Sequence, residues 1–464
     1  MAGLSGSLSI ALSALAVSQQ EIATTSNNVA NAQTPGYSRQ RPVTAAGDPV
    51  VFGSVTFGTG VLLQKIQSLR DPILEIQLNQ ETQTQNKLDA SLTQLQQMQT
   101  QFASSDSGVG ADISNFFKSL QTLSPDPSNL NLRQSVLTAA GTMASDFNKT
   151  ANSLQSQRSN LDLNVEQAVG QVNTLTAQIA SVGAQISNLQ NVHLDASPLV
   201  DTQTALIRKL SGLIDVTVIP TDQGATLATA NGTTLVSGSH SYALTAKLGL
   251  DNVQHVMAGT EDITSSLAGG SLAGMIQVRD VEIPSVQASL DALATGLATN
   301  LNAANAMGTD LEPTPVVLGV PDPAIQGGDI FSGTNAATLK VTMTDPAKIA
   351  ASSDGSAGSN GNLVNFANVA TTAINGRTPI DTYSSIVFQV GNDTSNTSAD
   401  ADASTAILQQ LQDQRGSISG VSLDEEAANL IQYQAAYQAA ARIVSTVSSL
   451  MSDAVNLGLG APVQ

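Results

Sequence analysis

Histidines and carboxylates are the residues of this 464-residue chain that could support catalysis or hold a metal ion. His193, His240 and His255 are isolated, and none has a second histidine at the spacing of a helical zinc site. The acidic triplet Asp424-Glu425-Glu426 precedes a stretch with helical periodicity. Carboxylates in the first turn of a helix complement its dipole, so the acidic triplet is interpreted as a helix start. The isolated histidines are interpreted as surface residues, and neither group is expected to be a metal site.

Nucleophiles and cofactor loops have equally little support. The chain has no cysteine, which excludes disulfides, thiolate zinc ligands and cysteine nucleophiles. Serine is abundant, but no G-x-S-x-G elbow is present. Gly355, Gly358 and Gly361 recur at intervals of three, but no lysine follows them, so they indicate a flexible loop. We therefore expect no catalytic residue, no cofactor site and no metal site, and the chain is not predicted to be an enzyme.

The charge balance limits the possible partners. Lys and Arg number 18 against 37 Asp and Glu, which gives a net charge of −19. An acidic chain with so few cations is a poor ligand for nucleic acid or anionic membranes. No stretch approaches the ~18 uninterrupted apolar residues of a membrane span, and no Sec-type signal peptide is expected because no cation precedes Arg39. We therefore expect neither nucleic acid nor membrane as a partner, and either a cytosolic protein or export without a cleavable signal.

The two ends of the chain carry an apolar repeat of seven residues, which is typical of helices that pair in a coiled coil. Four buried aliphatic side chains contribute about 6–12 kcal/mol. Ordering some 30 residues costs about 1–2 kcal/mol each, which helical hydrogen bonds offset only in part. The terminal helices are thus expected to need each other and neighbouring subunits. The predicted assembly seam consists of Leu8, Leu15, Ile22, Val29, Leu430, Tyr437, Val444 and Met451.

Between the ends, helical spacing of apolar residues predicts a helix over 71–103 and a long one around 154–189. A helix of roughly 45 residues would be about 68 Å long, which indicates a rod. We expect the 154–189 stripe to be an ordinary core inside the subunit. Residues 214–267 then change to short strands, with a hairpin at Asn231-Gly232 in which both residues are expected to take positive φ.

The segment 309–400 is rich in Gly, Pro, Asp, Asn, Ser and Thr and predicts a second β-rich region, with strands at Leu339–Met343 and Ile386–Val390. The fold class is therefore α+β multidomain, with paired terminal coiled-coil helices, a long helical-bundle rod domain and β-rich outer insertions. The expected units are a terminal coiled-coil assembly domain (1–40 with 428–464), a helical rod domain (41–213 with 268–308 and 401–427), a β-hairpin-rich insertion (214–267) and a second β-rich insertion (309–400).

Two terminal motifs are specific enough to suggest a family. Residues 25–31 read TSNNVAN, residues 34–40 read TPGYSRQ, and residues 419–431 read SGVSLDEEAANLI. These segments resemble the FlgK family of flagellar hook-associated proteins, and GGSLAG at 269–274 and GDIF at 328–331 support the resemblance. The motif residues are Asn27, Asn28, Asn31, Thr34, Pro35, Gly36 and Tyr37.

The resemblance implies a structural subunit of the bacterial flagellum that forms the junction layer between hook and filament and a platform for filament assembly. It implies secretion, unfolded, through the flagellar type III export route. The implied partners are other copies of the chain in a helical layer, the hook protein, the next junction protein and the filament, and a cytoplasmic export chaperone on the C-terminal helix.

Other classes of protein remain open. Another flagellar axial protein (hook, rod or flagellin-like) would share the arrangement of the two chain ends. Only the residues of the terminal motifs distinguish that alternative from the FlgK family. A surface adhesin fits the Ser, Thr and Asn content less well, because neither a signal peptide nor a C-terminal membrane barrel is evident.

Overall fold

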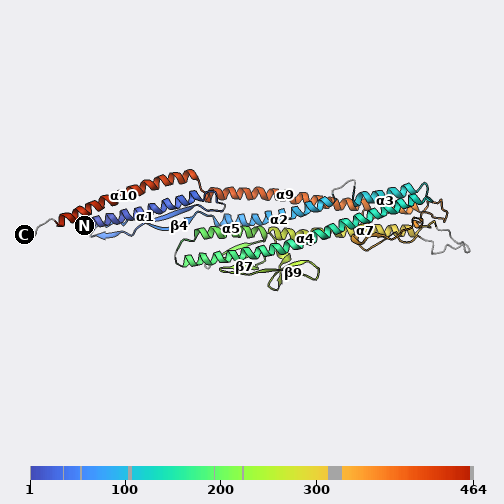
Figure 1. Ribbon diagram of the computed structural model, residues 1–464, viewed down its shortest axis with the longest axis horizontal. Coiled ribbons are helices and arrows are strands. Elements are labelled where there is room, and N and C mark those ends of the chain that lie inside the picture. The colour runs from blue at the N-terminus through green and yellow to red at the C-terminus, as the bar shows by residue number, and fades with distance from the viewer. Residues whose placement is uncertain are drawn as a thin grey trace, which may run out of the picture.

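The computed structural model describes residues 2–34, 36–52, 55–102, 107–192, 194–221, 224–311 and 327–459. The protein is elongated, its helices run along the long axis, and both chain ends lie at one tip (Figure 1). The α-helices are α1 (Ala2–Ala30), α2 (Pro72–Phe102), α3 (Val109–Leu123), α4 (Leu130–Asn191), α5 (Ser197–Leu213), α6 (Gly270–Gln277), α7 (Ile283–Ala306), α8 (Leu363–Val369), α9 (Pro379–Ser419) and α10 (Leu423–Leu459).

The strands of the described residues form small antiparallel sheets: β1 with β4, β2 with β3, β5-β6-β7-β8, β9-β10-β11, and β12 with β13. Short 3-10 turns and one π-helical turn, Val278–Glu282 between α6 and α7, complete the elements. The strands are β1 (Gln40–Ala46), β2 (Val50–Phe52), β3 (Val55–Phe57), β4 (Val61–Ser68), β5 (Thr217–Thr221), β6 (Gly224–Ala228), β7 (Thr234–Ser237), β8 (His240–Ser241), β9 (Leu244–Leu248), β10 (Gln254–Ala258), β11 (Glu261–Asp262), β12 (Phe331–Ser332) and β13 (Lys340–Val341).

Helix α4 is the backbone of the rod. It starts after the Pro125–Pro127 break, where the side chain of Asn129 accepts hydrogen bonds from the N–H groups of Asn131 and Leu132, and its 62 residues span about 93 Å. The helix is longer than the predicted 45 residues. Its apolar stripe packs inside the subunit, since Leu154, Leu161, Val165, Val172 and Ile179 are all fully buried, so the prediction of an internal core is confirmed.

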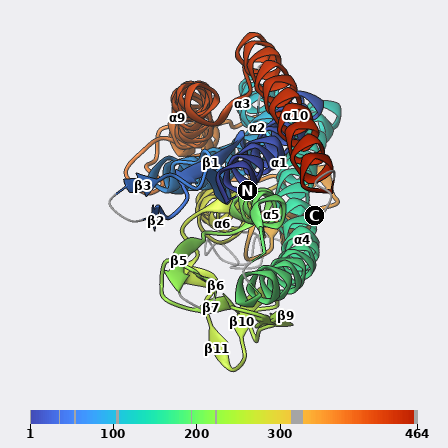
Figure 2. The same cartoon turned by 90° about the vertical axis from the view of Figure 1, so that its left-hand side faces the viewer.

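The rod core has two parts along α4. The first half of α4 packs with α3, α7, α8 and α9 around Phe116, Phe147 and Phe331. The second half packs with α5, α6 and the sheets β5–β11. Figure 2 shows these sheets on the side of α4 that faces away from α10. Each part has its own apolar core, so the rod does not depend on the terminal helices for burial.

The hairpin at Asn231-Gly232 forms, but with a different turn from the predicted one. Gly232 has φ +91° and Asn231 does not have positive φ. The Gly232 N–H donates to the Thr229 carbonyl at 2.9 Å, and the Thr229 N–H donates to the Thr233 carbonyl at 2.9 Å. The loop is therefore a turn followed by a glycine bulge, which requires positive φ at only one residue.

The strand predicted at Ile386–Val390 is wrong, because these residues lie within α9. Thr378 caps this helix by accepting a hydrogen bond from the Asp381 N–H. Ile386 and Val390 lie four residues apart, and both are buried on one helical face. Of the predicted strand Leu339–Met343, only β13 is extended in a sheet. The division of the chain into four units stays a prediction, and α9 crosses its boundary at residue 400.

At the tip with both chain ends, α1 and α10 pack against each other along most of their length and run in opposite directions (Figures 1 and 2). Strands β1 to β4 lie on the other side of α1 from α10. We call residues 2–68 and 420–459 the terminal module.

Candidate assembly site

The end of α1, the start of β1 and the first turn of α10 meet at Asn28, which is 1% exposed. Its Nδ2 donates to the Gln40 carbonyl at 2.9 Å and to Glu426 Oε2 at 3.1 Å. Its Oδ1 accepts from the Gln40 N–H at 2.9 Å and from the Tyr37 hydroxyl at 2.8 Å. The amide thus makes all four hydrogen bonds of which it is capable. An aspartate of the same shape would lose both donated bonds.

Arg39 completes this arrangement. Its Nε donates to Glu426 Oε1 at 2.6 Å, and its two terminal nitrogens donate to both carboxylate oxygens of Glu425 at 2.8 and 2.9 Å. The Arg39 N–H donates to the Ser419 carbonyl at 2.9 Å, and its own carbonyl accepts from the Leu69 N–H at 2.8 Å. One residue therefore joins β1, the end of β4 and the α9–α10 connection. We call Asn28, Tyr37, Arg39, Gln40, Glu425 and Glu426 the root network.

The pKa values of Tyr37 and Glu425 are shifted in the directions that favour these hydrogen bonds. Burial raises the pKa of Tyr37 to about 12, with further contributions from the charges of Asp201 and Glu426. The Tyr37 hydroxyl therefore remains a donor to Asn28 at physiological pH. The hydrogen bonds from Arg39 hold the pKa of Glu425 below its usual value.

A second group of charges ties this region to the rod. Glu75 on α2 is 7% exposed and accepts from Arg415 Nε at 2.7 Å and from Arg208 on α5. Arg415 on α9 also donates to the Gly36 carbonyl at 2.9 Å. Arg70 pairs with Asp201 on α5. The loop before β1 is therefore bonded to α9 at Gly36 and, through the Ser38 N–H that donates to Asp201 at 3.4 Å, to α5, so the root network has a defined position relative to the rod.

The remaining motif residues shape this loop. Asn31 Nδ2 donates to Asn27 Oδ1 at 2.6 Å, and the Thr34 hydroxyl donates to Asn31 Oδ1 at 3.2 Å. Gly36 has φ +83°, which is unfavourable for residues with a side chain. Its carbonyl accepts the hydrogen bond from Arg415. Pro35 lies outside the described residues.

The predicted seam residues lie on α1 and α10, which pack against each other, and most of them remain partly accessible. On α1, two sets of buried positions have seven-residue spacing, Ala11, Ser18 and Thr25 in one and Val17 and Thr24 in the other, and on α10 Ala440 and Val447 are buried. The structure leaves Leu8, Leu15, Ile22, Leu430, Tyr437, Val444 and Met451 half-buried and Val29 exposed.

Sequence reasoning placed Asp424-Glu425-Glu426 correctly in the first turn of α10, but it missed the pairing of Glu425 and Glu426 with Arg39. A signal existed. Arg39 is the first cation of the chain, and it stands in one terminal motif while the carboxylates stand in the other. Arg70, Arg208 and Arg415 carried no comparable signal, because only the fold brings them together.

The groups first considered for chemistry are engaged structurally. His255 Nδ1 lies 2.6 Å from Asp262 Oδ2, and Nε2 lies 3.1 Å from Asp251 Oδ1. These carboxylates, Asp251 first, raise the pKa of His255. His240 lies on the surface beside Ser239, and His193 falls outside the described residues. Among the described residues, no group of three or more His, Asp or Glu side chains could hold a metal ion.

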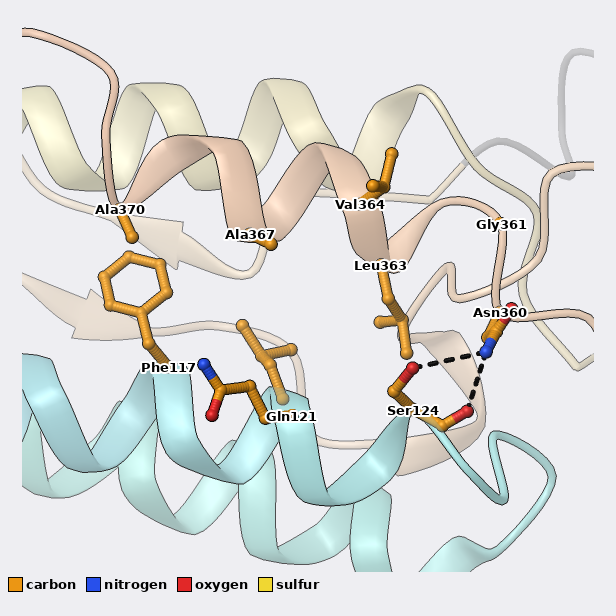
Figure 3. Close-up of a pocket in the computed structure, with 10 residues that line it drawn as sticks. Phe117, Gln121, Ser124, Asn360, Gly361, Leu363, Val364, Ala367 and Ala370 are labelled. Carbon is orange, nitrogen blue, oxygen red and sulfur yellow. Dashed lines mark hydrogen bonds between the residues drawn. The ribbon is translucent and has the colours of Figure 1, made fainter.

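A groove of about 500 Å³ lies between α3 and α8 (Figure 3), and α3 lies at the end of the rod away from the chain ends (Figure 1). Phe117, Leu363 and Ala367 line it, and Asn360 at its edge donates to the Ser124 carbonyl at 2.9 Å. Its lining residues are all uncharged, so the groove offers no acid, base or metal ligand. Within the part of the chain that the structure describes, no helix has the length and apolar character needed to cross a membrane.

Comparison with known proteins places these features in context. Residues 95–317 match the family described as flagellar hook-associated protein FlgK helical domain. Residues 8–37 match the flagella basal body rod protein family, and residues 414–457 match the C-terminal family of flagellar basal body rod FlgEFG proteins. The root network is built from the two matched terminal segments and the residues just after the first.

Full-length relatives agree. The chain is 30% identical to flagellar hook-associated protein 1 of Bacillus subtilis, over 98% of each chain. It is 26% identical to flagellar hook-associated protein 1 of Escherichia coli, over 98% of this chain and 100% of the relative. The structure of the flagellar hook junction protein FlgK from Burkholderia pseudomallei superposes with a TM-score of 0.66 at 16% identity, covering 74% of this chain and 100% of that one, which shows a shared fold.

Proposed function

The chain belongs to the family of flagellar hook-associated protein 1, and we propose that its terminal module is the part that builds it into the flagellum. The chain is a structural subunit of the hook–filament junction, and it associates with hook and filament components.

The observation that carries the proposal is the root network. It brings residues from both ends of the chain together at buried Asn28 and Glu426. Beyond it, the predicted seam residues of α1 and α10 are half-buried or, at Val29, exposed in the single subunit. A helix pair that is fixed at its root and incompletely buried along its length gains apolar burial when neighbours add to it. We infer that copies of the chain self-associate through this module in a helical layer, on the hook protein and beneath the next junction protein and the filament.

The same incomplete burial accounts for the steps before assembly. Ile431, Ile443 and Leu450 on α10 are about half-exposed or more. A cytoplasmic chaperone on this helix would cover such positions before the chain is secreted, unfolded, by type III export. A variant truncated after residue 429 should then lose its cytoplasmic chaperone complex in co-purification, whereas loss of β5–β11 should leave the complex intact.

We also propose that the chain works without catalysis. Both nitrogens of His255 contact carboxylates, which raise its pKa and occupy the atoms that a general base would use. An assay of the purified protein against peptidoglycan and peptide substrates checks this. Hydrolysis that a single substitution abolishes would contradict it.

A deletion strain tests the function directly. Cells lacking the chain should make hooks without filaments and shed filament protein into the medium. The full chain should restore filaments, and Asn28→Asp should not, because it removes both hydrogen bonds that Asn28 donates. Ser26→Ala, at an exposed position on the same helix, is the matched control. Normal filaments in the deletion strain would refute a junction role, and normal filaments with Asn28→Asp would refute the role of the root network.

A further inference from the structure

Exposed apolar side chains are concentrated on the terminal module. Of the 30 large hydrophobic residues exposed in the described part of the chain, eight lie before residue 69 and five after residue 419, which makes 13. The module contains about a quarter of the described residues. Exposed apolar surface gathered in this way marks an interaction site. The inference below rests on the proposed function and names the two surfaces that meet.

The first surface is a groove between the first turns of α1 and the β2–β3 hairpin, with a volume of about 690 Å³. Ile10, Val50 and Phe57 line it and are 40%, 48% and 55% exposed. Gly3 and Gly6 also line it, and nothing stands within 4 Å of where their Cβ atoms would be. The absence of side chains there leaves room for another helix to approach closely. We call this surface the hairpin groove.

The second surface is a ridge on α10. Ile443 and Leu450 are 51% and 49% exposed. They are seven residues apart, about 10.5 Å along one flank of the helix, beside the seam that packs on α1. The stretch between Arg442 and Asp453 contains no charged residue. We call Ile443 and Leu450 the α10 ridge.

The two surfaces cannot satisfy each other within one subunit. α10 lies along one side of α1, and the β2–β3 hairpin lies along the other (Figures 1 and 2). A contact between different surfaces of identical subunits is heterologous, and it continues from copy to copy as a ring or an open helix. This is the geometry that a layer of one protein requires, so the fitting occupant is a second copy of this chain.

Charge supports the same occupant. No charged residue precedes Glu21 in α1, so an apolar ridge can enter the groove without burying a charge of α1. At its rim is Asp48, whose carbonyl accepts from the groove residue Thr59 at 2.8 Å. Arg442 precedes the ridge, is exposed, and forms no salt bridge with any described residue. The ridge ends in Asp453 on its other side, so the complementary arrangement between copies places the Arg442 end of the ridge against the Asp48 rim.

We propose that the hairpin groove of one subunit receives the α10 ridge of its neighbour. Because the chain has no cysteine, a pair of introduced cysteines reports the contact without background. Cells producing the Phe57→Cys/Leu450→Cys variant should, after mild oxidation, yield a ladder of disulfide-linked multimers of this chain from isolated flagella. Phe57→Cys/Ile431→Cys is the control, since Ile431 is 70% exposed and lies on a different face of α10, and it should yield monomers.

A charge exchange provides a second measurement. Phe57→Lys and Leu450→Glu should each reduce filaments per cell by at least tenfold, and the double variant should recover most of them, because each interface would then contain a Lys–Glu pair. The absence of a ladder together with no recovery would overturn the proposal, as would a cross-link to a protein of different mass. Failure of the junction role itself would differ, because deletion of the whole chain would then leave filaments intact.

Discussion

Replacing Glu426 by alanine should detach the root of the terminal helices while leaving the rod intact. The Glu426 side chain is 2% exposed and Arg39 is 17% exposed. Breaking a buried ion pair from one side costs about 3–5 kcal/mol. Arg39 keeps its two bonds to Glu425, so its charge stays compensated and the cost falls at the lower end, about 3 kcal/mol. At about 1.4 kcal/mol per factor of ten, local opening becomes roughly 100-fold more frequent.

Amide hydrogen exchange measures this opening at the bonds concerned. The N–H groups of Arg39, Gln40 and Leu69 donate within the root and should exchange roughly 100-fold faster in Glu426→Ala, as the opening free energy falls by about 3 kcal/mol. Amides in the middle of α4 should not change. Glu425→Ala is the matched control, because Glu425 is 56% exposed and an exposed pair contributes about 0–1 kcal/mol. Equal acceleration by the two variants, or acceleration that extends through α4, would refute the reasoning.

Three further predictions concern other parts of the chain. Burial and the neighbouring Asp146 raise the pKa of Asp112 to about 6, so between pH 4 and 6 the folded state holds a proton that the unfolded state has lost, and stability falls as pH rises through that range. Urea titrations of Asp112→Asn should therefore show a free energy of unfolding about 1–3 kcal/mol higher than that of the native protein at pH 7.5 and no higher at pH 4. Val444→Asp places a charge in the half-buried seam, so we expect near-normal melting of the rod by calorimetry but no incorporation at the hook tip, and normal filament numbers would argue against the seam. His255 has a raised pKa because of Asp251 and Asp262, so its contribution to folding stability is complete below pH 6.5 and is lost as pH rises through the folded pKa. Amide hydrogen exchange in β10 and β11 should accelerate over that range in the native protein. In His255→Gln, exchange there should follow only the intrinsic dependence of the exchange rate on pH.

Helices and their faces were predictable because apolar periodicity reports burial directly. The apolar stripe of α4 through Leu161 and Val172 is buried because that side of the helix packs against the other elements of the rod. The same reasoning failed at Ile386–Val390, where β-branched residues in a stretch rich in small polar residues suggest a strand. The free energy there comes from packing of Ile386 and Val390 against the rod, which overrides local propensity.

The contacts of the candidate site were less predictable, for a different reason. The terminal motif identified Asn28 and Tyr37 as candidate residues, but no local sequence pattern specifies the hydrogen-bond partners of a buried amide. Gln40 lies 12 residues away in sequence and Glu426 lies 398 residues away. On α1, the large apolar repeat was expected to be the seam, whereas the buried positions are Val17 and the small or polar residues Ala11, Ser18, Thr24, Thr25 and Asn28. Small side chains allow the closest approach between helices, and the larger residues beside them are left for further contacts.

The division between a largely apolar rod and a polar root follows from what each must achieve. The rod has to be stable alone, and its two apolar cores around α4 provide that. The charges buried in the rod are compensated, since Arg133 donates to backbone carbonyls and Arg279 pairs with Asp162 and Asp280. The root has to fix one register between helices from opposite ends of the chain, with seams too incomplete to fix it by burial. A buried polar network suits this because any slip leaves Asn28 or Glu426 without partners, at a cost of about 1–3 kcal/mol or more for each unsatisfied group. The arrangement adds little net stability, since buried ion pairs seldom do, but it penalises every wrong register. A subunit whose helices are presented in one register offers its neighbour the same groove and the same ridge each time, which is the condition for a regular layer.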